Sequence, residues 1–248
     1  MSPHASHNEV PRESAGRLDG GRHPLRIGGI TPFSTIDWPG KLTCVAFLAG
    51  CPWRCPYCQN FALQSAHAAR LTDTDLFGFL DARRGLLDGV VFSGGEPLAQ
   101  PGVVDAARHV REMGFGVALH TCGVYPALLR EMMPYLDWVG LDVKAPWEDY
   151  DTLTHGCDSA MAVRESLALL VASGVDLEVR TTWHPDLLGT QDITGIAHEL
   201  ARCGVRNWAV QAYRHVGTSG ELANATVYPQ DLPQDLPALF ETFEFRRA

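Results

Sequence analysis

Six apolar runs alternate with helical segments along most of this chain, and this order restricts the fold more than any other feature. The expected strands are residues 43–48, 89–93, 116–120, 138–142, 176–181 and 208–211. The expected helices lie between them, at about 72–84, 103–113, 126–133, 160–172 and 193–202. Strands that alternate with helices form right-handed βαβ units and a parallel sheet. Six units are too few for a closed eight-stranded barrel, so the pattern leaves an open sheet or a partial barrel.

Three cysteines follow the first expected strand on one short loop. Cys51, Cys55 and Cys58 lie four and three positions apart, and Pro52 and Pro56 prevent the loop from winding into a helix. Thiolates this close repel one another unless a metal ion or an iron-sulfur cluster offsets their charge. A structural zinc ion would need a fourth ligand, which does not follow at a usual spacing. Three cysteines fit a 4Fe-4S cluster with one iron free of protein ligands, and structural zinc is the alternative.

Motifs on both sides of this loop extend the pattern. Tyr57 is the aromatic residue of a C-x3-C-x-aromatic-C loop, which resembles the cluster loop of the radical S-adenosylmethionine (SAM) superfamily. Together with residues 29–41, 93–97 and 141–144, the loop is similar to the activating proteins of anaerobic ribonucleoside-triphosphate reductase, and the similarity runs over about residues 27–217. The resemblance implies an α/β fold that is a partial (β/α)6 TIM-type barrel. It also implies a 4Fe-4S cluster on the three cysteines and bound SAM.

Polar motifs lie at the carboxyl ends of the expected strands, where parallel α/β folds assemble their sites. We therefore expect them to share one face of the barrel. With the resemblance, the residues assigned to cofactor binding are Tyr57, Ser93, Gly94, Gly95, Glu96, Thr121, Asp142, Lys144, Arg180 and Arg214.

Two of these motifs have specific expected roles. In the resembled family, the segment matching Gly94, Gly95 and Glu96 holds the amino group of SAM, and Lys144 matches a residue that helps to hold its carboxylate. The alternatives are a tight turn for the first motif and a solvated ion pair between Asp142 and Lys144 for the second. Lys144 follows an interior strand, where an ammonium group needs a partner.

The remaining candidates rest mostly on their positions in the resembled family. Arg180 fits a carboxylate- or ribose-binding residue, and Arg214 matches a position near the adenosyl group, although either could be a surface charge. His120 and Thr121 stand where related activases carry an Asp-Thr pair of a monovalent cation site, and this departure leaves such a site open. Asp37 lies in a segment resembling the Asp-Gly-Pro-Gly stretch of the activases and is a candidate contact for a partner's glycine loop.

The other four cysteines, Cys44, Cys122, Cys157 and Cys203, are dispersed and predict no disulfide framework. Cys44 is most simply a small buried hydrophobe, whereas Cys122 faces the expected site.

Composition limits the partners and the domain plan. The chain of 248 residues has a formal net charge of -9 and no basic face, which gives no electrostatic case for nucleic acid or an anionic membrane. Residues 1–25 are polar and predict a disordered tail without a signal or membrane segment, followed by one radical SAM domain at 26–248 in a cytoplasmic protein. Prolines in residues 217–248 argue against a long helix or a substantial lid.

The resemblance implies a radical-generating activase. A reduced cluster would cleave SAM to a 5'-deoxyadenosyl radical, which would form a glycyl radical on anaerobic ribonucleoside-triphosphate reductase. An electron donor such as flavodoxin or ferredoxin is implied. The alternatives are a small-molecule radical SAM enzyme, such as a 7-carboxy-7-deazaguanine synthase, and a structural metal-binding protein.

Overall fold

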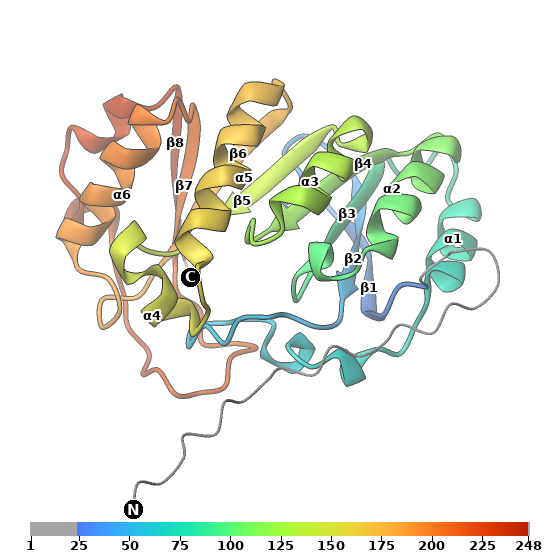
Figure 1. The fold of residues 1–248 in the computed structure, drawn as a ribbon, viewed down its shortest axis with the longest axis horizontal. Coiled ribbons are helices and arrows are strands. Elements are labelled where there is room, and N and C mark those ends of the chain that lie inside the picture. Colours follow the sequence, from blue (N-terminus) through green and yellow to red (C-terminus); the bar gives the residue numbers. More distant parts are fainter. Residues whose placement is uncertain (1–23, 248) are drawn as a thin grey trace, which may run out of the picture.

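Eight strands form one continuous sheet, in the order β1 to β8, in the computed structural model, which describes residues 24–247 (Figure 1). The strands are β1 (Ile27–Ser34), β2 (Thr43–Leu48), β3 (Gly89–Gly94), β4 (Gly116–Thr121), β5 (Trp138–Asp142), β6 (Asp176–Trp183), β7 (Asn207–Ala212) and β8 (Thr242–Arg246). Strands β2 to β8 pair in parallel, and β1 pairs antiparallel with β2. The six predicted strands are confirmed as β2 to β7.

The outer face of the sheet is covered by helices (Figure 1). They are α1 (Asp73–Asp81), α2 (Gly102–Glu112), α3 (Pro126–Met132), α4 (Tyr150–Thr154), α5 (Ser159–Ser173) and α6 (Thr190–Arg202). Each predicted helix is present with its ends shifted by a few residues, and the short α4 was not predicted. Thr72 precedes α1 as expected, and its backbone N–H donates to the Asp75 carboxylate at 2.8 Å, which satisfies one free donor of the first turn.

Alternate residues of each strand face the helices or the barrel interior, as the two-residue period of a strand requires. The helix-facing residues belong to the large core, whereas Val45, Val91, Ala118 and Trp138 form a separate interior cluster with Trp38. Trp38 comes from the connection between β1 and β2. The ring of Trp38 therefore fills the interior near the amino ends of the strands. Gly89 and Gly116 make room for this ring, because a Cβ atom at either position would lie 2.9 Å from it.

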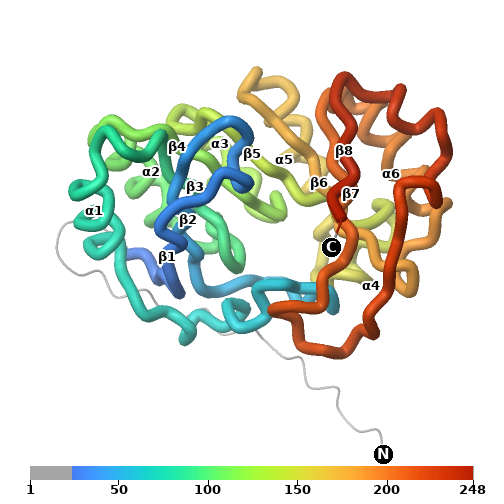
Figure 2. The backbone as a smooth tube through the Cα atoms, turned by 180° about the vertical axis from the view of Figure 1, so that it is seen from behind, coloured from blue at the N-terminus to red at the C-terminus, as the bar shows by residue number. Residues whose placement is uncertain are grey.

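Strands β1 and β8 pair with only one neighbour each, so the barrel is open on one side between them (Figure 2). The predicted partial barrel is confirmed, with these two strands added at its edges. The prediction missed β1 because Gly28, Gly29 and Pro32 weaken its strand pattern, and it missed β8 because the strand follows a proline-rich stretch.

The two ends of the described chain differ in their relation to the prediction. The predicted tail lies outside the described residues except for Pro24 and Leu25, and Leu25 is buried in the core. After β7, the described chain forms no long helix, as expected. That segment instead runs beside the cysteine loop, where the Phe61 N–H donates to the Gly217 carbonyl at 3.2 Å. Within residues 24–247 no helix combines the length and apolar character needed to span a membrane.

Candidate active site

A cavity of about 640 Å³ opens at the carboxyl ends of the parallel strands. It brings together almost all of the residues that the sequence assigned to one site. Those lining it are Asp37, Cys51, Cys55, Tyr57, Cys58, Ser93, Gly94, Gly95, Thr121, Asp142, Lys144, Arg180 and Arg214. The assigned residue that does not line it is Glu96.

The cysteine loop is held in place by backbone hydrogen bonds. The Cys51 N–H donates to the Gln64 carbonyl, and the Cys58 N–H donates to the Cys55 carbonyl, both at 3.1 Å. Cys55 is buried, and the other two cysteines are half-buried. Burial raises the pKa of the Cys51 thiol to about 12 and also raises that of Cys55. Each of these thiols therefore needs a positively charged group beside it in order to ionise to the thiolate that binds a metal.

The donor set of the cavity fits an iron-sulfur cluster. Cys51, Cys55 and Cys58 all line it, and thiolates are the usual protein ligands of such clusters. A structural zinc ion would need a fourth ligand beside these three. Within residues 24–247, no three His, Cys, Asp or Glu side chains are grouped so that they could hold one metal ion.

Tyr57 lines the cavity and carries a hydroxyl group that could donate to a ligand. This hydroxyl is buried and has no hydrogen-bond partner among the described residues. Burial raises the pKa of Tyr57, so the hydroxyl remains a donor. A buried polar group without a partner costs about 1–3 kcal/mol, which a hydrogen bond to a bound ligand would offset.

Asp142 and Lys144 form an ion pair in which the ammonium group is the more buried member. Lys144 Nζ lies 3.0 Å from Asp142 Oδ2, with the Lys144 side chain 12% exposed and that of Asp142 43% exposed. Burial alone would lower the pKa of Lys144, but the charges of Asp142 and of the neighbouring Tyr57, Cys55 and Cys122 together outweigh it, and the pKa is raised well above its usual value. The solvated-pair explanation does not fit this burial. The Lys144 ammonium group lies at the cavity wall, where it could bind an anionic ligand while it stays paired with Asp142.

Gly94 and Gly95 are required by close approach of the backbone. A Cβ atom on Gly94 would lie 2.4 Å from the backbone of Leu48, and one on Gly95 would lie 2.3 Å from the Gly50 carbonyl oxygen. Gly94 also has a φ of +116°, which favours glycine. Asn60, which the sequence reasoning missed, donates from Nδ2 to the Gly94 carbonyl at 2.8 Å. Its position two residues after the third cysteine was the available signal.

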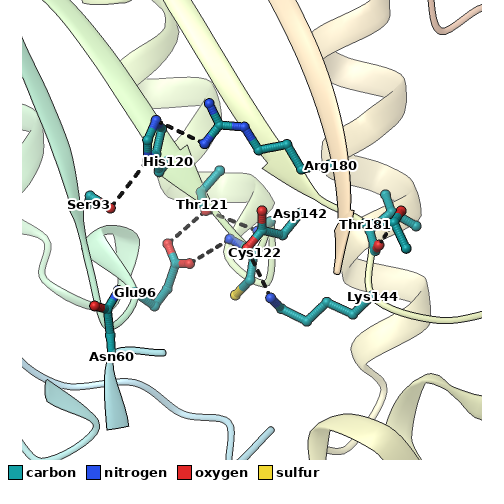
Figure 3. Close-up of polar contacts among 12 residues, drawn as sticks. Asn60, Ser93, Glu96, His120, Thr121, Cys122, Asp142, Lys144, Arg180 and Thr181 are labelled. Carbon is teal, nitrogen blue, oxygen red and sulfur yellow. Dashed lines mark hydrogen bonds and ion pairs between the residues drawn. The ribbon is translucent and has the colours of Figure 1, made fainter. Parts of the chain in front are cut away.

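Glu96 is turned away from the cavity. Its side chain is fully buried and accepts hydrogen bonds from Leu98 N at 2.9 Å, Thr121 Oγ1 at 2.7 Å and Cys122 N at 2.8 Å (Figure 3). Burial raises the pKa of Glu96, and the hydrogen bonds from Cys122, Thr121 and Leu98 offset part of this. The carboxylate joins the turns that follow β3 and β4. The predicted contact between Glu96 and the amino group of SAM has no support from this placement and stays a prediction.

A chain of polar contacts crosses the barrel interior beneath the cavity. Arg180 donates from Nε to Glu178 at 2.7 Å, and its Nη1 lies 3.1 Å from His120 Nε2 (Figure 3). The same His120 nitrogen lies 2.8 Å from the Asp37 carbonyl, and Nδ1 lies 3.3 Å from Ser93 Oγ. Burial, together with the charge of Arg180, lowers the pKa of His120 to about 3, so the ring is neutral at neutral pH. Sequence reasoning gave no role to Glu178.

The other predicted residues lie at different depths. Arg214 is on the exposed rim, where its Nη2 donates to Gln59 Oε1 at 3.3 Å. Cys122 lines the cavity, and burial raises its pKa well above the usual value, so it is a neutral thiol. Cys44 is fully buried, as expected of a small hydrophobe. All seven cysteines lie within the described residues and are free, which confirms the absence of a disulfide framework.

Comparisons of the sequence with known proteins agree with this site. Residues 45–187 match the family model described as the Radical SAM superfamily. A Methanocaldococcus jannaschii protein with the provisional name glycyl-radical enzyme activating enzyme is 31% identical over 194 residues, which cover 75% of this chain and 79% of that protein. The pyruvate formate-lyase-activating enzyme of Clostridium pasteurianum is 32% identical over 157 residues, 59% of this chain and 66% of the enzyme.

A peptide-modifying enzyme is also among the relatives. The PqqA peptide cyclase of Streptomyces rochei is 35% identical over 159 residues, which cover 61% of this chain but only 42% of the cyclase.

Solved structures share the fold. SuiB of Streptococcus suis, bound to its precursor peptide SuiA, superposes with a TM-score of 0.62 at 12% identity, over 78% of this chain and 46% of SuiB. The enzyme anSMEcpe with bound AdoMet superposes with a TM-score of 0.55 at 14% identity, over 77% of this chain and 55% of that enzyme. At these identities the likeness concerns the fold alone.

Proposed function

The chain belongs to the radical SAM superfamily, whose enzymes use a 4Fe-4S cluster and SAM, and we propose that it activates an anaerobic ribonucleoside-triphosphate reductase by forming a glycyl radical on it. One observation carries the proposal. The three cysteines and Asp37, which lies in the connection after the edge strand β1, line one cavity. A segment of a partner protein that enters this cavity would therefore meet the proposed cluster and Asp37 together.

The chemistry proposed for this site needs few acid or base groups from the protein. Cys51, Cys55 and Cys58 would hold the cluster, which would supply the one electron needed to cleave bound SAM to methionine and a 5'-deoxyadenosyl radical. The chemistry thus supplied would abstract the hydrogen atom of the partner's glycine α-carbon, with 5'-deoxyadenosine and a glycyl radical as the products. The residues of this chain bind, orient and exclude water. Lys144 holds the ligand carboxylate beside Asp142, and the Tyr57 hydroxyl donates to the ligand. The Gly94-Gly95 backbone lets it approach closely.

The proposal also names the other participants. The partner presents its glycine on an exposed loop, because the glycine α-carbon has to enter the cavity to reach bound SAM. Flavodoxin or ferredoxin supplies the electron, and the reaction takes place in the cytoplasm. Residues 29–41, 93–97 and 141–144 support the choice of reductase, since they resemble its activating proteins.

Modification of a peptide is the second candidate function. It is favoured by the similarity to the PqqA peptide cyclase and by the fold shared with SuiB, whose structure contains a precursor peptide. A peptide could enter the same cavity as a glycine loop. The two functions differ in their product: a stable radical on a large protein, or a new covalent bond in a small peptide.

The deciding experiment uses the reduced, cluster-loaded protein with SAM and an anaerobic reductase encoded beside it. We expect a glycyl radical, visible by electron paramagnetic resonance as a doublet from the remaining α-hydrogen. A reductase with alanine in place of its radical glycine is the matched control and should give no doublet. If wild-type reductase stays silent while a peptide or small metabolite is transformed at the expense of SAM, the activase proposal is wrong.

A further inference from the structure

Glu178 lies between two arginines inside the barrel. Its Oε1 accepts from Arg180 Nε at 2.7 Å, and Arg246 donates to both of its oxygens, at 2.9 and 2.8 Å. All three side chains are largely shielded, with exposed fractions of 12% for Glu178, 9% for Arg180 and 23% for Arg246. Burial opposes ionisation of Glu178, but the hydrogen bonds from Arg246 and the charge of Arg180 lower its pKa. The group is thus a charged chain of two arginines and one carboxylate.

This chain fixes the direction of the Arg180 guanidinium. Its Nε is committed to Glu178 and its Nη1 faces His120, while its Cζ lies 5.0 Å from the centre of the Trp138 ring. A Cβ atom on Gly140 would lie 3.1 Å from Cζ, so glycine leaves room for the guanidinium. Among residues 24–247, no hydrogen-bond partner is found for the other terminal nitrogen of Arg180, Nη2. The Arg180 side chain also lines the cavity. A free donor of a held guanidinium is thereby available to a ligand.

The chemistry of the guanidinium group also favours an oxygen-bearing ligand. The charges of the chain balance, because Glu244 pairs with Arg246 at 2.7 Å and Glu178 lies between the two arginines. A guanidinium group has only N–H donors, so the free N–H groups of Arg180 suit an oxygen acceptor. Figure 3 shows Arg180 and His120 on one side of the site and Lys144 with the Cys122 sulfur on the other. Arg180 and Lys144 can therefore bind two different parts of one ligand.

We infer that Glu178 and Arg246 are positioning residues, which hold Arg180 so that its free N–H groups bind an oxygen acceptor of SAM. Strand β8 then contributes to SAM affinity although its own side chains do not line the cavity. Removing one member of such a buried chain leaves an uncompensated charge and frees the others to reorient. The inference rests on SAM as the ligand and not on the choice of partner protein.

The test is calorimetric titration of SAM into the anaerobic, cluster-loaded protein, without any partner, for Arg246→Ala and for the matched control Arg206→Ala. Arg206 precedes β7 and also pairs with a glutamate, Glu241, at 3.5 Å, but both side chains are exposed and take no part in this chain of contacts. Loss of the ordered guanidinium contact should weaken SAM binding about tenfold or more in Arg246→Ala, because hydrogen bonds to charged groups contribute about 1.5–3 kcal/mol. Iron content should be unchanged in both variants.

Two further measurements separate positioning from general damage. Guanidinium ion added at millimolar concentration should restore part of the SAM affinity of Arg246→Ala, whereas a destabilised fold would not recover. Glu178→Gln should weaken SAM binding to a similar degree, and the double variant should be no weaker than either single one, because all three changes release the same Arg180. Unchanged SAM affinity in Arg246→Ala, an equal loss in Arg206→Ala, or additive losses in the double variant would overturn the inference.

Discussion

The barrel has two hollows of about 640 Å³ each, one at either end of its strands, and they differ in chemistry rather than in size. Several polar groups that line the hollow at the amino ends have partners: Arg111 pairs with Asp137, and Asp88 accepts from the Leu42 N–H at 2.7 Å. The cavity at the carboxyl ends contains three half-buried or buried thiols and an unpartnered Tyr57 hydroxyl. Unsatisfied groups, and not volume, identify the site.

The layer between the two hollows explains how they stay distinct. Trp38 and Trp138 line the amino-end hollow, and His120 and Arg180 line the cavity on the other side of the same layer. The Trp138 ring centre lies 5.6 Å from that of His120, so the two linings are in contact. A change to a side chain that lines the carboxyl-end cavity should therefore affect ligands directly. Among the residues of the amino-end hollow, we expect an effect on ligands only from Glu178, because it holds Arg180.

The largest effect is expected from the cysteine loop. Cys51→Ala, Cys55→Ala and Cys58→Ala should each lose the iron-sulfur cluster, because each of these thiolates is expected to bind the cluster and two alone would not hold it. Iron and sulfide content after anaerobic reconstitution measures this. Cys203→Ala, which changes an exposed cysteine outside both hollows, should retain the full content. Full iron content in any of the three loop variants would remove that cysteine from the ligand set.

His120, which lies in the layer between the two hollows, should contribute to the pH dependence of the free energy of unfolding. His120 has a folded pKa of about 3 and an ordinary value of 6.5. Between these values the unfolded state binds the proton and the folded state does not, so stability falls as the pH falls, by about 1.4 kcal/mol per pH unit from this group. The stability is fully present above pH 6.5. Thermal unfolding of cluster-free protein between pH 7 and 4 should show a shallower pH dependence in His120→Gln.

The control for that measurement is His67→Gln, because His67 is exposed and lies outside both hollows. It should unfold with the pH dependence of the wild type. Equal slopes in wild type and His120→Gln would mean that His120 takes up its proton near the ordinary pKa.

One lysine lines each of the two sites, so alanine variants of Lys144 and Lys41 allow a direct comparison of the cavity and the amino-end hollow. Lys144→Ala should keep the cluster but bind SAM about 10- to 100-fold more weakly, because a charge-assisted hydrogen bond of about 1.5–3 kcal/mol is lost. Lys41 lines the amino-end hollow, and Lys41→Ala should bind SAM as the wild type does. Calorimetry on both loaded variants decides the matter, and equal affinities would return Lys144 to the role of an ion-pair partner.

The smallest effect concerns Asp37, which is proposed to contact the partner and not the cofactor. Asp37→Ala should lower glycyl-radical formation by about tenfold, the cost of one hydrogen bond, while uncoupled SAM cleavage stays near the wild-type rate. Asp176→Ala, in the amino-end hollow, should change neither rate. Spin counting of the glycyl radical and chromatography of 5'-deoxyadenosine provide the two rates. A parallel fall in both rates for Asp37→Ala would place this residue with the cofactor.

Sequence patterns predicted what depends on near neighbours in the chain. The bounds of β2 and β5 were predicted residue for residue, because continuous apolar runs mark buried strands. The strand-end rule also placed Lys144 and Arg180 on one cavity, without any contact being known.

Contacts between distant residues could not be predicted in this way. Arg246 meets Glu178 across 68 positions, and His120 meets Asp37 across 83, so no local period links them. The direction of Glu96 depends on donors in the next βα turn, which the pattern of its own segment does not contain. The edge strands β1 and β8 were missed for a related reason. Their own residues form a weak strand pattern, and pairing with the neighbouring strand stabilises them.

The cavity wall extends beyond the part of the chain that matches the family. The match covers residues 45–187, yet Asp37, Gln211, Arg214 and Gly217 also line the cavity. A hybrid protein that took residues 45–187 from a relative would import the cysteine loop and the Lys144 position as one unit. It would keep the rim and the last strand of this chain. Such an exchange would therefore show how much of the cavity's behaviour depends on residues outside the matched segment.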